Sequence, residues 1–269
     1  MAAARKKSPE TVLVTGASAG IGESLARCFA ADGHRLVLVA RSADKLQALA
    51  DRLTAEHGSK VWVMPADLAQ PGAPAALSAQ LRRKRIAIDV LVNNAGVLEH
   101  GAFAAIPAGR NQALIDLNVS ALTAMIGEFL PGMLKRGHGR ILNVASIAAF
   151  QPVPSLAAYA ATKAYVLSLT ESLAEELKRS GVTITALCPG ITATGMLTDA
   201  AAANPQLAKL PGFIVGDVDA VAADGYRACM KGEVIKVPGV VNLAATLAGR
   251  ATPKWMVRRV AGGLFRKAL

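Results

Sequence analysis

The residues best suited to chemistry are Tyr159 and Lys163, which are four positions apart in the chain. On a helix such positions lie on one face, so the tyrosine hydroxyl and the lysine ammonium can share a site. Tyrosine has an ordinary pKa of about 10, which is too high for proton transfer at neutral pH. Because a neighbouring cation favours the phenolate, Lys163 is expected to lower the pKa of Tyr159 and prepare it for acid–base catalysis.

Two further polar residues accompany this pair. Ser146 comes thirteen residues before Tyr159, at the end of an apolar run, and Asn118 lies earlier in the chain. The Ser146 hydroxyl is able to donate a hydrogen bond to a substrate carbonyl. A Tyr-x-x-x-Lys spacing taken alone is more often a surface pair on a helix. Its combination with Ser146, Asn118 and the glycine-rich turn described next favours a catalytic role.

That glycine-rich turn follows the first apolar run, between a predicted strand and a predicted helix. Glycines let the chain turn tightly and let backbone N–H groups approach a pyrophosphate at the positive end of the following helix. A glycine cluster is weak evidence by itself, but its position at the start of a strand–helix–strand unit makes it a strong signal for a dinucleotide. The candidate contacts are Gly16, Ser18, Gly20, Ile21 and Gly22.

The second predicted strand ends in Ala40-Arg41-Ser42. An NAD-preferring site usually has Asp or Glu at this point, where it binds the ribose 2′-hydroxyl. Arg41 can instead hold a 2′-phosphate in a charge-assisted contact, and Ser42 can add a hydroxyl. The sequence therefore predicts NADP(H) as the cofactor. The alternative is that Arg41 is a solvated loop charge.

The elements that must position these residues alternate along the chain. Short apolar runs that suit strands buried on both faces are separated by stretches long enough for a helix. This pattern predicts an α/β fold, a single doubly wound Rossmann-type domain over residues 8–240 with a seven-stranded parallel sheet. The expected strands are 11–15, 35–40, 60–64, 88–92, 139–144, 182–187 and 233–237.

Two segments depart from this alternation. Residues 192–216 have no strand pattern, and we expect them to form a substrate lid, or alternatively an ordinary pair of surface helices. Residues 241–269 are a basic amphipathic C-terminal segment with an apolar stripe, basic flanks and Trp255. Within it, Thr252-Pro253 looks like an N-cap followed by Pro at the first helical position, so a helix is expected after Thr252. This helix suits a membrane surface or packing on protein, and a disordered tail is the alternative.

These motifs together resemble the short-chain dehydrogenase/reductase family, whose glycine turn is spaced Gly-x-x-x-Gly-x-Gly, over about residues 10–240. The resemblance implies that Tyr159 protonates the developing alkoxide, that Lys163 also binds the nicotinamide ribose, and that Asn118 holds a water relaying protons to that lysine. Asn93 is as well suited to joining neighbouring strands as to touching a ligand. Further implied cofactor contacts are Asp67, Leu68, Asn94, Ala95, Gly96, Pro189, Gly190, Ile191 and Thr192.

Composition limits the other classes of function. The net charge is +11, but residues 1–7 hold three Lys/Arg and residues 234–269 hold seven with no Asp or Glu. The nearly neutral body argues against nucleic-acid binding. The three scattered cysteines lack metal-ligand spacing, so no metal is expected. No apolar run reaches the roughly 20 residues of a bilayer-spanning helix, which favours a cytoplasmic protein. Peripheral membrane contact through the C-terminal segment remains an open alternative.

Two functions follow. The first is an NADP(H)-dependent oxidoreductase that transfers a hydride between nicotinamide and the carbonyl or hydroxyl carbon of a small apolar substrate, since residues 192–216 are rich in Ala, Leu, Met and Phe. Members of the resembled family often pair, so a homo-oligomer is expected. The second is a non-catalytic NADP(H)-binding regulatory or interaction protein on the same fold. A protein that does not catalyse has no chemical need for Ser146, Tyr159, Lys163 and Asn118 together, which favours the first.

Overall fold

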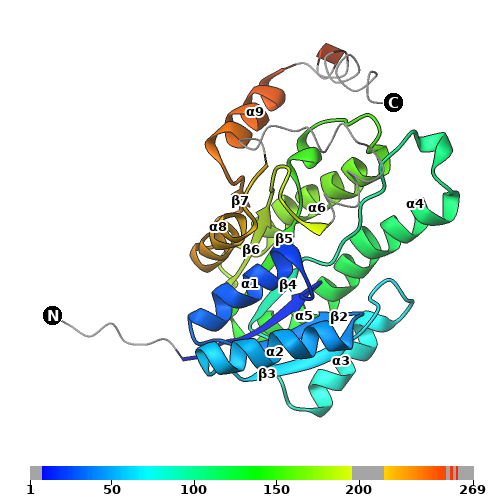
Figure 1. Cartoon of the computed structure of the whole chain (residues 1–269). Coiled ribbons are helices and arrows are strands. Elements are labelled where there is room, and N and C mark those ends of the chain that lie inside the picture. The colour runs from blue at the N-terminus through cyan, green and yellow to red at the C-terminus, as the bar shows by residue number, and fades with distance from the viewer. Residues whose placement is uncertain (1–7, 196–214, 253–254, 257–258, 260–269) are drawn as a thin grey trace.

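The sheet contains seven strands, all parallel, in the order β3-β2-β1-β4-β5-β6-β7. The computed structural model describes residues 8–195, 215–252, 255–256 and 259, and Figure 1 shows how its elements are arranged. The predicted doubly wound α/β fold with seven parallel strands is confirmed. The strands are β1 Thr11–Thr15, β2 Arg35–Ala40, β3 Val61–Pro65, β4 Val90–Asn93, β5 Gly139–Val144, β6 Val182–Leu187 and β7 Ile235–Lys236.

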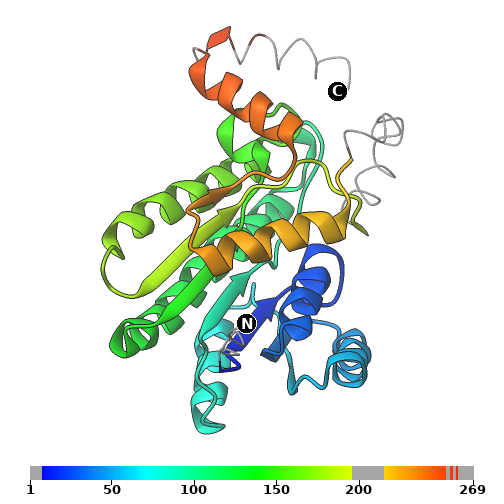
Figure 2. The ribbon, with the colours of Figure 1, turned by 90° about the vertical axis from the view of Figure 1, so that its left-hand side faces the viewer.

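Helices cover both faces of this sheet (Figure 2). One face carries α1, α2 and α8, and the other carries α3, α5 and α6. The helical elements are α1 Gly20–Ala31, α2 Ala43–His57, α3 Ala73–Arg83, η1 Phe103–Ala105, α4 Ala108–Ile115, η2 Asp116–Ala121, α5 Leu122–Arg136, η3 Ile147–Phe150, α6 Ala157–Glu176, α8 Val218–Lys231 and α9 Val240–Ala251.

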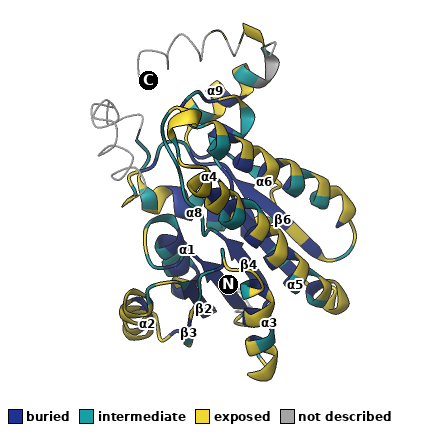
Figure 3. Cartoon of the chain, turned by 90° about the vertical axis from the view of Figure 1, so that its right-hand side faces the viewer, coloured by how far each residue is buried: buried dark blue, intermediate teal, exposed yellow. Residues whose placement is uncertain are grey.

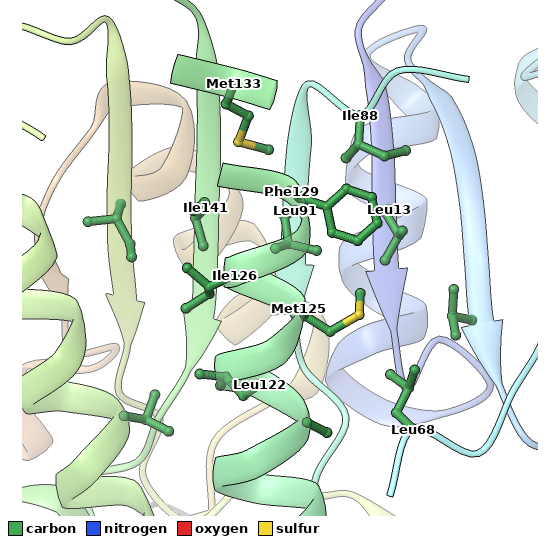
Figure 4. Packing of buried hydrophobic residues seen from close by; sticks show 14 of the residues in the cluster. Leu13, Leu68, Ile88, Leu91, Leu122, Met125, Ile126, Phe129, Met133 and Ile141 are labelled. Atoms are coloured by element: carbon green, nitrogen blue, oxygen red, sulfur yellow. The ribbon is translucent and has the colours of Figure 1, made fainter. Parts of the chain in front are cut away.

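Alternate residues of β1 enter two separate hydrophobic cores. Leu13 packs with side chains of α3, α5 and α6, whereas Val12 and Val14 pack with those of α1, α2 and α8. Figure 4 shows the first core, where Met125 and Phe129 of α5 lie against the strands. Because both faces of the central strands are buried (Figure 3), these strands are continuous apolar runs, which is why the sequence pattern located them.

The strand order reverses at β1, which lies between β2 and β4. The loops that follow β1 and β4 therefore leave the carboxyl edge of the sheet toward opposite faces, an arrangement that in open α/β sheets generally forms a crevice. Ligands of open α/β sheets bind in such a crevice. The glycine turn and the segment from Asn93 to Gly96 both start at this point of the sheet.

One helical stretch, Ala108–Arg136, is long and apolar enough by length and composition to cross a membrane. It comprises α4, η2 and α5. Its residues Met125, Ile126 and Phe129 are buried against the sheet, as expected for a core helix of an α/β domain.

Residues 192–216 leave the sheet edge and return to the same place. Thr192 and Gly216 form an isolated parallel bridge, and the Gly216 N–H donates to the carbonyl oxygen of Ile191 at 2.8 Å. Most of the predicted lid, residues 196–214, lies outside the described residues, so its form stays a prediction. The same holds for 253–254, 257–258 and 260–269 of the C-terminal segment.

The helix α9 was not anticipated from the sequence, which indicated a helix only after Thr252. In the structure Thr252 follows α9. Beyond it, Trp255, Met256 and Arg259 are helical. α9 packs against η3, so the first part of the C-terminal segment lies on the body of the protein.

Candidate active site

The turn after β1 depends on its glycines. Gly16 and Gly20 have φ angles of 63° and 57°, in the left-handed region that favours glycine. A Cβ on Gly22 would lie 2.4 Å from the Gly16 carbonyl oxygen and 2.3 Å from Asn94 Nδ2. The turn leads into α1, whose N-cap residue, Ala19, makes no side-chain cap. The first N–H groups of α1 are thus left for another acceptor, at a helix end that attracts phosphate.

Gly22→Ala is expected to lower the free energy of unfolding by about 2 kcal/mol, because the added methyl would overlap backbone atoms and Asn94. Chemical denaturation followed by circular dichroism measures this loss. Gly109→Ala in α4 is the matched control, since nothing lies within 4 Å of a Cβ there. Alanine favours a helix over glycine by up to about 1 kcal/mol, so the control should be stabilised slightly. Equal stabilities would contradict the close approach at Gly22.

A hydrogen-bond network joins this turn to the segment after β4. Asn94 Nδ2 donates to the carbonyl oxygens of Thr15 and Gly16, at 3.0 and 3.2 Å. Thr15 Oγ1 accepts from the backbone N–H groups of Asn94 and Ala95, at 2.9 and 3.0 Å, and donates to the Val92 carbonyl at 3.1 Å. Thr15 was missed by sequence reasoning, although a hydroxyl that ends a buried strand directly before a glycine is a usable signal.

Asn93 joins neighbouring strands, one of its two predicted roles. Its Nδ2 donates to Asn143 Oδ1 at 2.9 Å, which connects β4 to β5. Asn143 Nδ2 then donates to Thr170 Oγ1 of α6 at 2.9 Å. This buried chain of polar side chains fixes α6, the helix that carries Tyr159 and Lys163, against the sheet.

Ser146, Tyr159 and Lys163 come together beyond the carboxyl end of β5. Ser146 is the N-cap of η3, its Oγ accepts from the Ala148 N–H at 3.1 Å, and its side chain interacts with Tyr159. Both Tyr159 and Lys163 lie on α6, with Lys163 Nζ 5.7 Å from the centroid of the tyrosine ring. The Lys163 ammonium donates to the Val144 carbonyl at 2.8 Å. The strand end and the facing helix thus supply one site.

Burial sets the pKa values in this site. Desolvation raises the pKa of Tyr159, more than the interaction with Ser146 lowers it. The sequence predicted a lowered pKa for Tyr159, and that direction is wrong. The Lys163 ammonium points to the Val144 carbonyl, and burial lowers the pKa of Lys163 to about 8, so its positive charge is itself disfavoured. Tyr159 is therefore a protonated acid at neutral pH.

Asn118 lies in η2, a π-helical turn of the kind often found at functional sites. Its side chain pairs with the backbone of Val97, with the Oδ1 accepting and the Nδ2 donating at 2.9 Å each, and the Nδ2 also donates to Thr162 Oγ1 at 3.3 Å. A Cβ on Gly96 would lie 3.1 Å from Asn118 Oδ1 and 3.6 Å from Lys163 Nζ. Asn118 thus holds the segment after β4 against α6, and its role in a proton relay stays a prediction.

The turn after β6 borders the same site. The Pro189 carbonyl accepts from the Ile147 N–H at 2.9 Å, and Thr192 Oγ1 donates to the Gly190 carbonyl at 3.0 Å. A Cβ on Gly190 would lie 2.6 Å from Asn242 Nδ2 of α9. Asn242 was not among the predicted residues, because the helix that carries it was not anticipated.

Arg41 and Ser42 follow β2 at the same sheet edge. Arg41 is exposed, and no ion pair joins it to a carboxylate in the described part of the chain. Ser42 is the N-cap of α2 and makes no side-chain cap. After β3, Asp67 Oδ1 accepts from a backbone N–H of its own turn at 3.2 Å, and Leu68 is buried. Among the described residues Arg41 is thus without an ion-pair partner, and its contact with a phosphate stays a prediction.

All predicted site residues belong to segments that leave the carboxyl edge of the sheet or to helices that face it. They are Gly16, Ser18, Gly20, Ile21 and Gly22 after β1; Arg41 and Ser42 after β2; Asp67 and Leu68 after β3; Asn94, Ala95 and Gly96 after β4; Asn118 in η2; Ser146 after β5; Tyr159 and Lys163 in α6; and Pro189, Gly190, Ile191 and Thr192 after β6. Among the described residues, no group of three or more His, Cys, Asp or Glu side chains suits a metal ion.

A doubly wound parallel sheet with a glycine turn at its switch point defines the Rossmann-type α/β proteins. Within that class, the chain belongs to the short-chain dehydrogenase family, whose model matches residues 10–205. It is therefore an oxidoreductase of this family.

Curated and solved proteins agree with this assignment. The oxidoreductase UcpA of Escherichia coli (strain K12) is 37% identical over 203 residues, which are 75% of this chain and 76% of the relative. A short-chain dehydrogenase from Sphingobium yanoikuyae, solved with NADPH, is 37% identical with a TM-score of 0.80, covering 89% of this chain and 92% of that one. The bulky-bulky ketone specific alcohol dehydrogenase from Comamonas testosteroni is 30% identical with a TM-score of 0.75, covering 91% and 95%.

Proposed function

We propose that the protein is an NADP(H)-dependent carbonyl reductase or alcohol dehydrogenase that acts on an apolar substrate. The observation that carries the proposal is the cluster of Ser146, Tyr159 and Lys163 beside the segment after β4. A phenol that is protonated at neutral pH, next to a serine hydroxyl, suits proton donation to a carbonyl oxygen as it gains negative charge.

The residues present fit the proposed cofactor. Gly16, Gly20 and Gly22 let the backbone approach a ligand at the N-terminus of α1, where pyrophosphate is favoured. Arg41 supplies an exposed guanidinium for a 2′-phosphate at the neighbouring strand end. Similarity to a short-chain dehydrogenase solved with NADPH supports the same choice. When bound, NADP(H) supplies or accepts the hydride.

Each catalytic residue then has a defined task. Tyr159 gives its proton to the carbonyl oxygen of the substrate, and Ser146 donates a hydrogen bond to that oxygen. Lys163, with its pKa of about 8, is cationic at neutral pH and stabilises negative charge that develops on the phenol oxygen. Asn118 is a positioning residue that keeps the segment after β4 beside Lys163. For alcohol oxidation the proton moves in the opposite direction.

The substrate class rests on composition and on similarity. Residues 192–216 are rich in apolar side chains. One solved relative is specific for bulky-bulky ketones, which also favours an apolar carbonyl compound. A homo-oligomeric state, a cytoplasmic location and a division between residues 8–240 and 241–269 stay predictions.

Arg41→Ala is expected to weaken NADPH binding by at least about tenfold and to leave NADH binding within about twofold, because only NADPH has a 2′-phosphate for the guanidinium. Titration followed by reduced-nicotinamide fluorescence measures both affinities. Arg35→Ala is the matched control, since Arg35 lies at the opposite end of the same strand and is also exposed. If the unmodified protein bound NADH as tightly as NADPH, the assignment of Arg41 would be wrong.

A further inference from the structure

The helix α9 turns apolar side chains toward the solvent and polar side chains toward the protein. Over residues 240–249, where its side chains are described, the exposed ones are aliphatic, and the exposed fractions reach 84% for Val240, 70% for Val241 and 58% for Leu247. Its buried position is Thr246, at 7% exposure, and its Asn242 points inward, donating to the Pro238 carbonyl at 2.9 Å. A helix on the surface of a globular protein normally turns its apolar stripe to the core and its polar face to water. The remaining exposed α9 residues are Leu243, Ala244, Ala245 and Ala248.

The exposed apolar surface continues past the end of α9. Trp255 and Met256 are 55% and 41% exposed. The guanidinium of Arg259 lies 6.0 Å from the centroid of the Trp255 ring, in a cation–π contact. Figure 1 shows α9 at one end of the molecule, away from α2 and α3. We call the exposed side chains of α9 together with Trp255 and Met256 the α9 surface.

The charge around this surface indicates its partner. The sequence of residues 234–269 contains seven Lys or Arg residues and no Asp or Glu. Lys236 pairs with Asp224, and Arg259 is described beside Trp255. A symmetric contact between two copies would bring together two segments of the same positive charge, because each copy would present the same surface to the other. Basic residues beside exposed aliphatic and tryptophan side chains instead suit a lipid surface with anionic headgroups, where each basic residue contributes favourably.

We propose that the α9 surface binds the protein peripherally to a membrane that contains anionic lipids. The aliphatic side chains and Trp255 enter the boundary between headgroups and acyl chains, and the basic residues contact lipid phosphates. On its inner side, α9 touches Gly190 through Asn242 and packs against η3, which begins directly after Ser146. Membrane binding would therefore bring this edge of the candidate active site close to the bilayer, the phase into which an apolar substrate partitions.

Vesicle sedimentation tests the proposal on the full chain. The protein is mixed with vesicles of phosphatidylcholine alone and of phosphatidylcholine with phosphatidylglycerol, at low and high salt. We expect binding to the mixed vesicles that weakens with salt, and little binding to phosphatidylcholine alone. The double variant Val241→Ser, Leu247→Ser should bind the mixed vesicles about tenfold or more weakly, because it removes two inserted side chains without changing the charge.

Two controls separate insertion from simple charge attraction. Leu134→Ser removes an exposed leucine of α5, 42% exposed and outside the α9 surface, and should leave vesicle binding unchanged. In a Trp62→Phe background, Trp255 is the remaining tryptophan of the two in the chain, and its emission should shift to the blue when mixed vesicles are added.

Three outcomes would overturn the proposal. In the first, the double serine variant binds the mixed vesicles as well as the unmodified protein does, which would mean that charge attraction alone accounts for the binding. In the second, binding to pure phosphatidylcholine is equally strong. In the third, no vesicle binding occurs and light scattering shows a dimer that the double variant abolishes, which would assign the surface to a second copy. Turnover of a water-soluble carbonyl compound should be equal in all variants, which shows that each is folded.

Discussion

Tyr159→Phe is expected to lower kcat by about a thousandfold while the Kd for NADPH stays within about threefold, since a positioned proton donor typically contributes factors of 10² to 10⁴. Phenylalanine keeps the ring that packs beside Lys163 and removes the hydroxyl next to Ser146. Stopped-flow turnover and fluorescence titration separate the two constants. Loss of turnover with cofactor binding retained is the signature of a group that acts in the chemical step.

The control for this variant is Tyr165→Phe. Tyr165 lies on the same helix, and its hydroxyl hydrogen-bonds to Thr123 of α5 at 2.9 Å, away from Ser146. It should leave kcat within about twofold. If Tyr159→Phe turned over normally, the proposed role of the phenol would be refuted, and the non-catalytic NADP(H)-binding function would become the better explanation.

The raised pKa of Tyr159 also predicts how the rates of reduction and oxidation change with pH. Carbonyl reduction needs the protonated phenol, which is the form present throughout the neutral range. Alcohol oxidation needs the phenolate, which that raised pKa disfavours. The reductive rate should therefore persist at neutral pH, and the oxidative rate should rise toward alkaline pH.

Lys163→Met is expected to abolish measurable turnover and, at neutral pH, to raise the free energy of unfolding by about 2 kcal/mol. Burial lowers the pKa of Lys163 from its ordinary 10.5 to about 8 in the folded protein, so the folded state binds the lysine proton less tightly than the unfolded chain does. The full shift would correspond to about 3 kcal/mol, and loss of the hydrogen bond to the Val144 carbonyl offsets part of it.

The pH dependence of the stability of Lys163→Met can also be measured. A basic group whose folded pKa is lowered destabilises the fold fully below that pKa, and the penalty disappears as the pH rises to the unfolded value. The stability difference between Lys163→Met and the unmodified protein should therefore be constant below pH 8 and decrease between about 8 and 10.5. Urea denaturation at several pH values measures it. A destabilised Lys163→Met protein would contradict the burial argument.

The sequence located the sheet well because its strands are buried on both faces. The runs predicted at 11–15, 35–40, 139–144 and 182–187 coincide with β1, β2, β5 and β6. The predicted last strand, 233–237, is shorter in the structure, where β7 is Ile235–Lys236 and pairs with β6. α9 was missed because its exposed positions are apolar and its inward positions are polar, which is the reverse of the pattern that a surface helix usually has.

The sequence predicted the residues of the candidate site better than it predicted the pKa of Tyr159. Spacing alone placed Tyr159 and Lys163 on one helix face, and the strand end placed Ser146 opposite them. The direction of the Tyr159 pKa depends on how much water the folded chain excludes and on where the lysine ammonium points. Both are products of tertiary packing. The hydrogen bonds between Thr15 and Asn94 likewise form only because β1 and β4 are neighbours in the sheet.

The bridge between Thr192 and Gly216 has a consequence for how this enzyme could change over evolution. Because the chain leaves and returns at one point of the sheet edge, the stretch between these residues is a closed loop whose length is independent of the strand register. The entropy cost of closing a loop grows only slowly with its length. Insertions, deletions or whole exchanges of this stretch should therefore be tolerated by the sheet while the glycine turn is inherited intact.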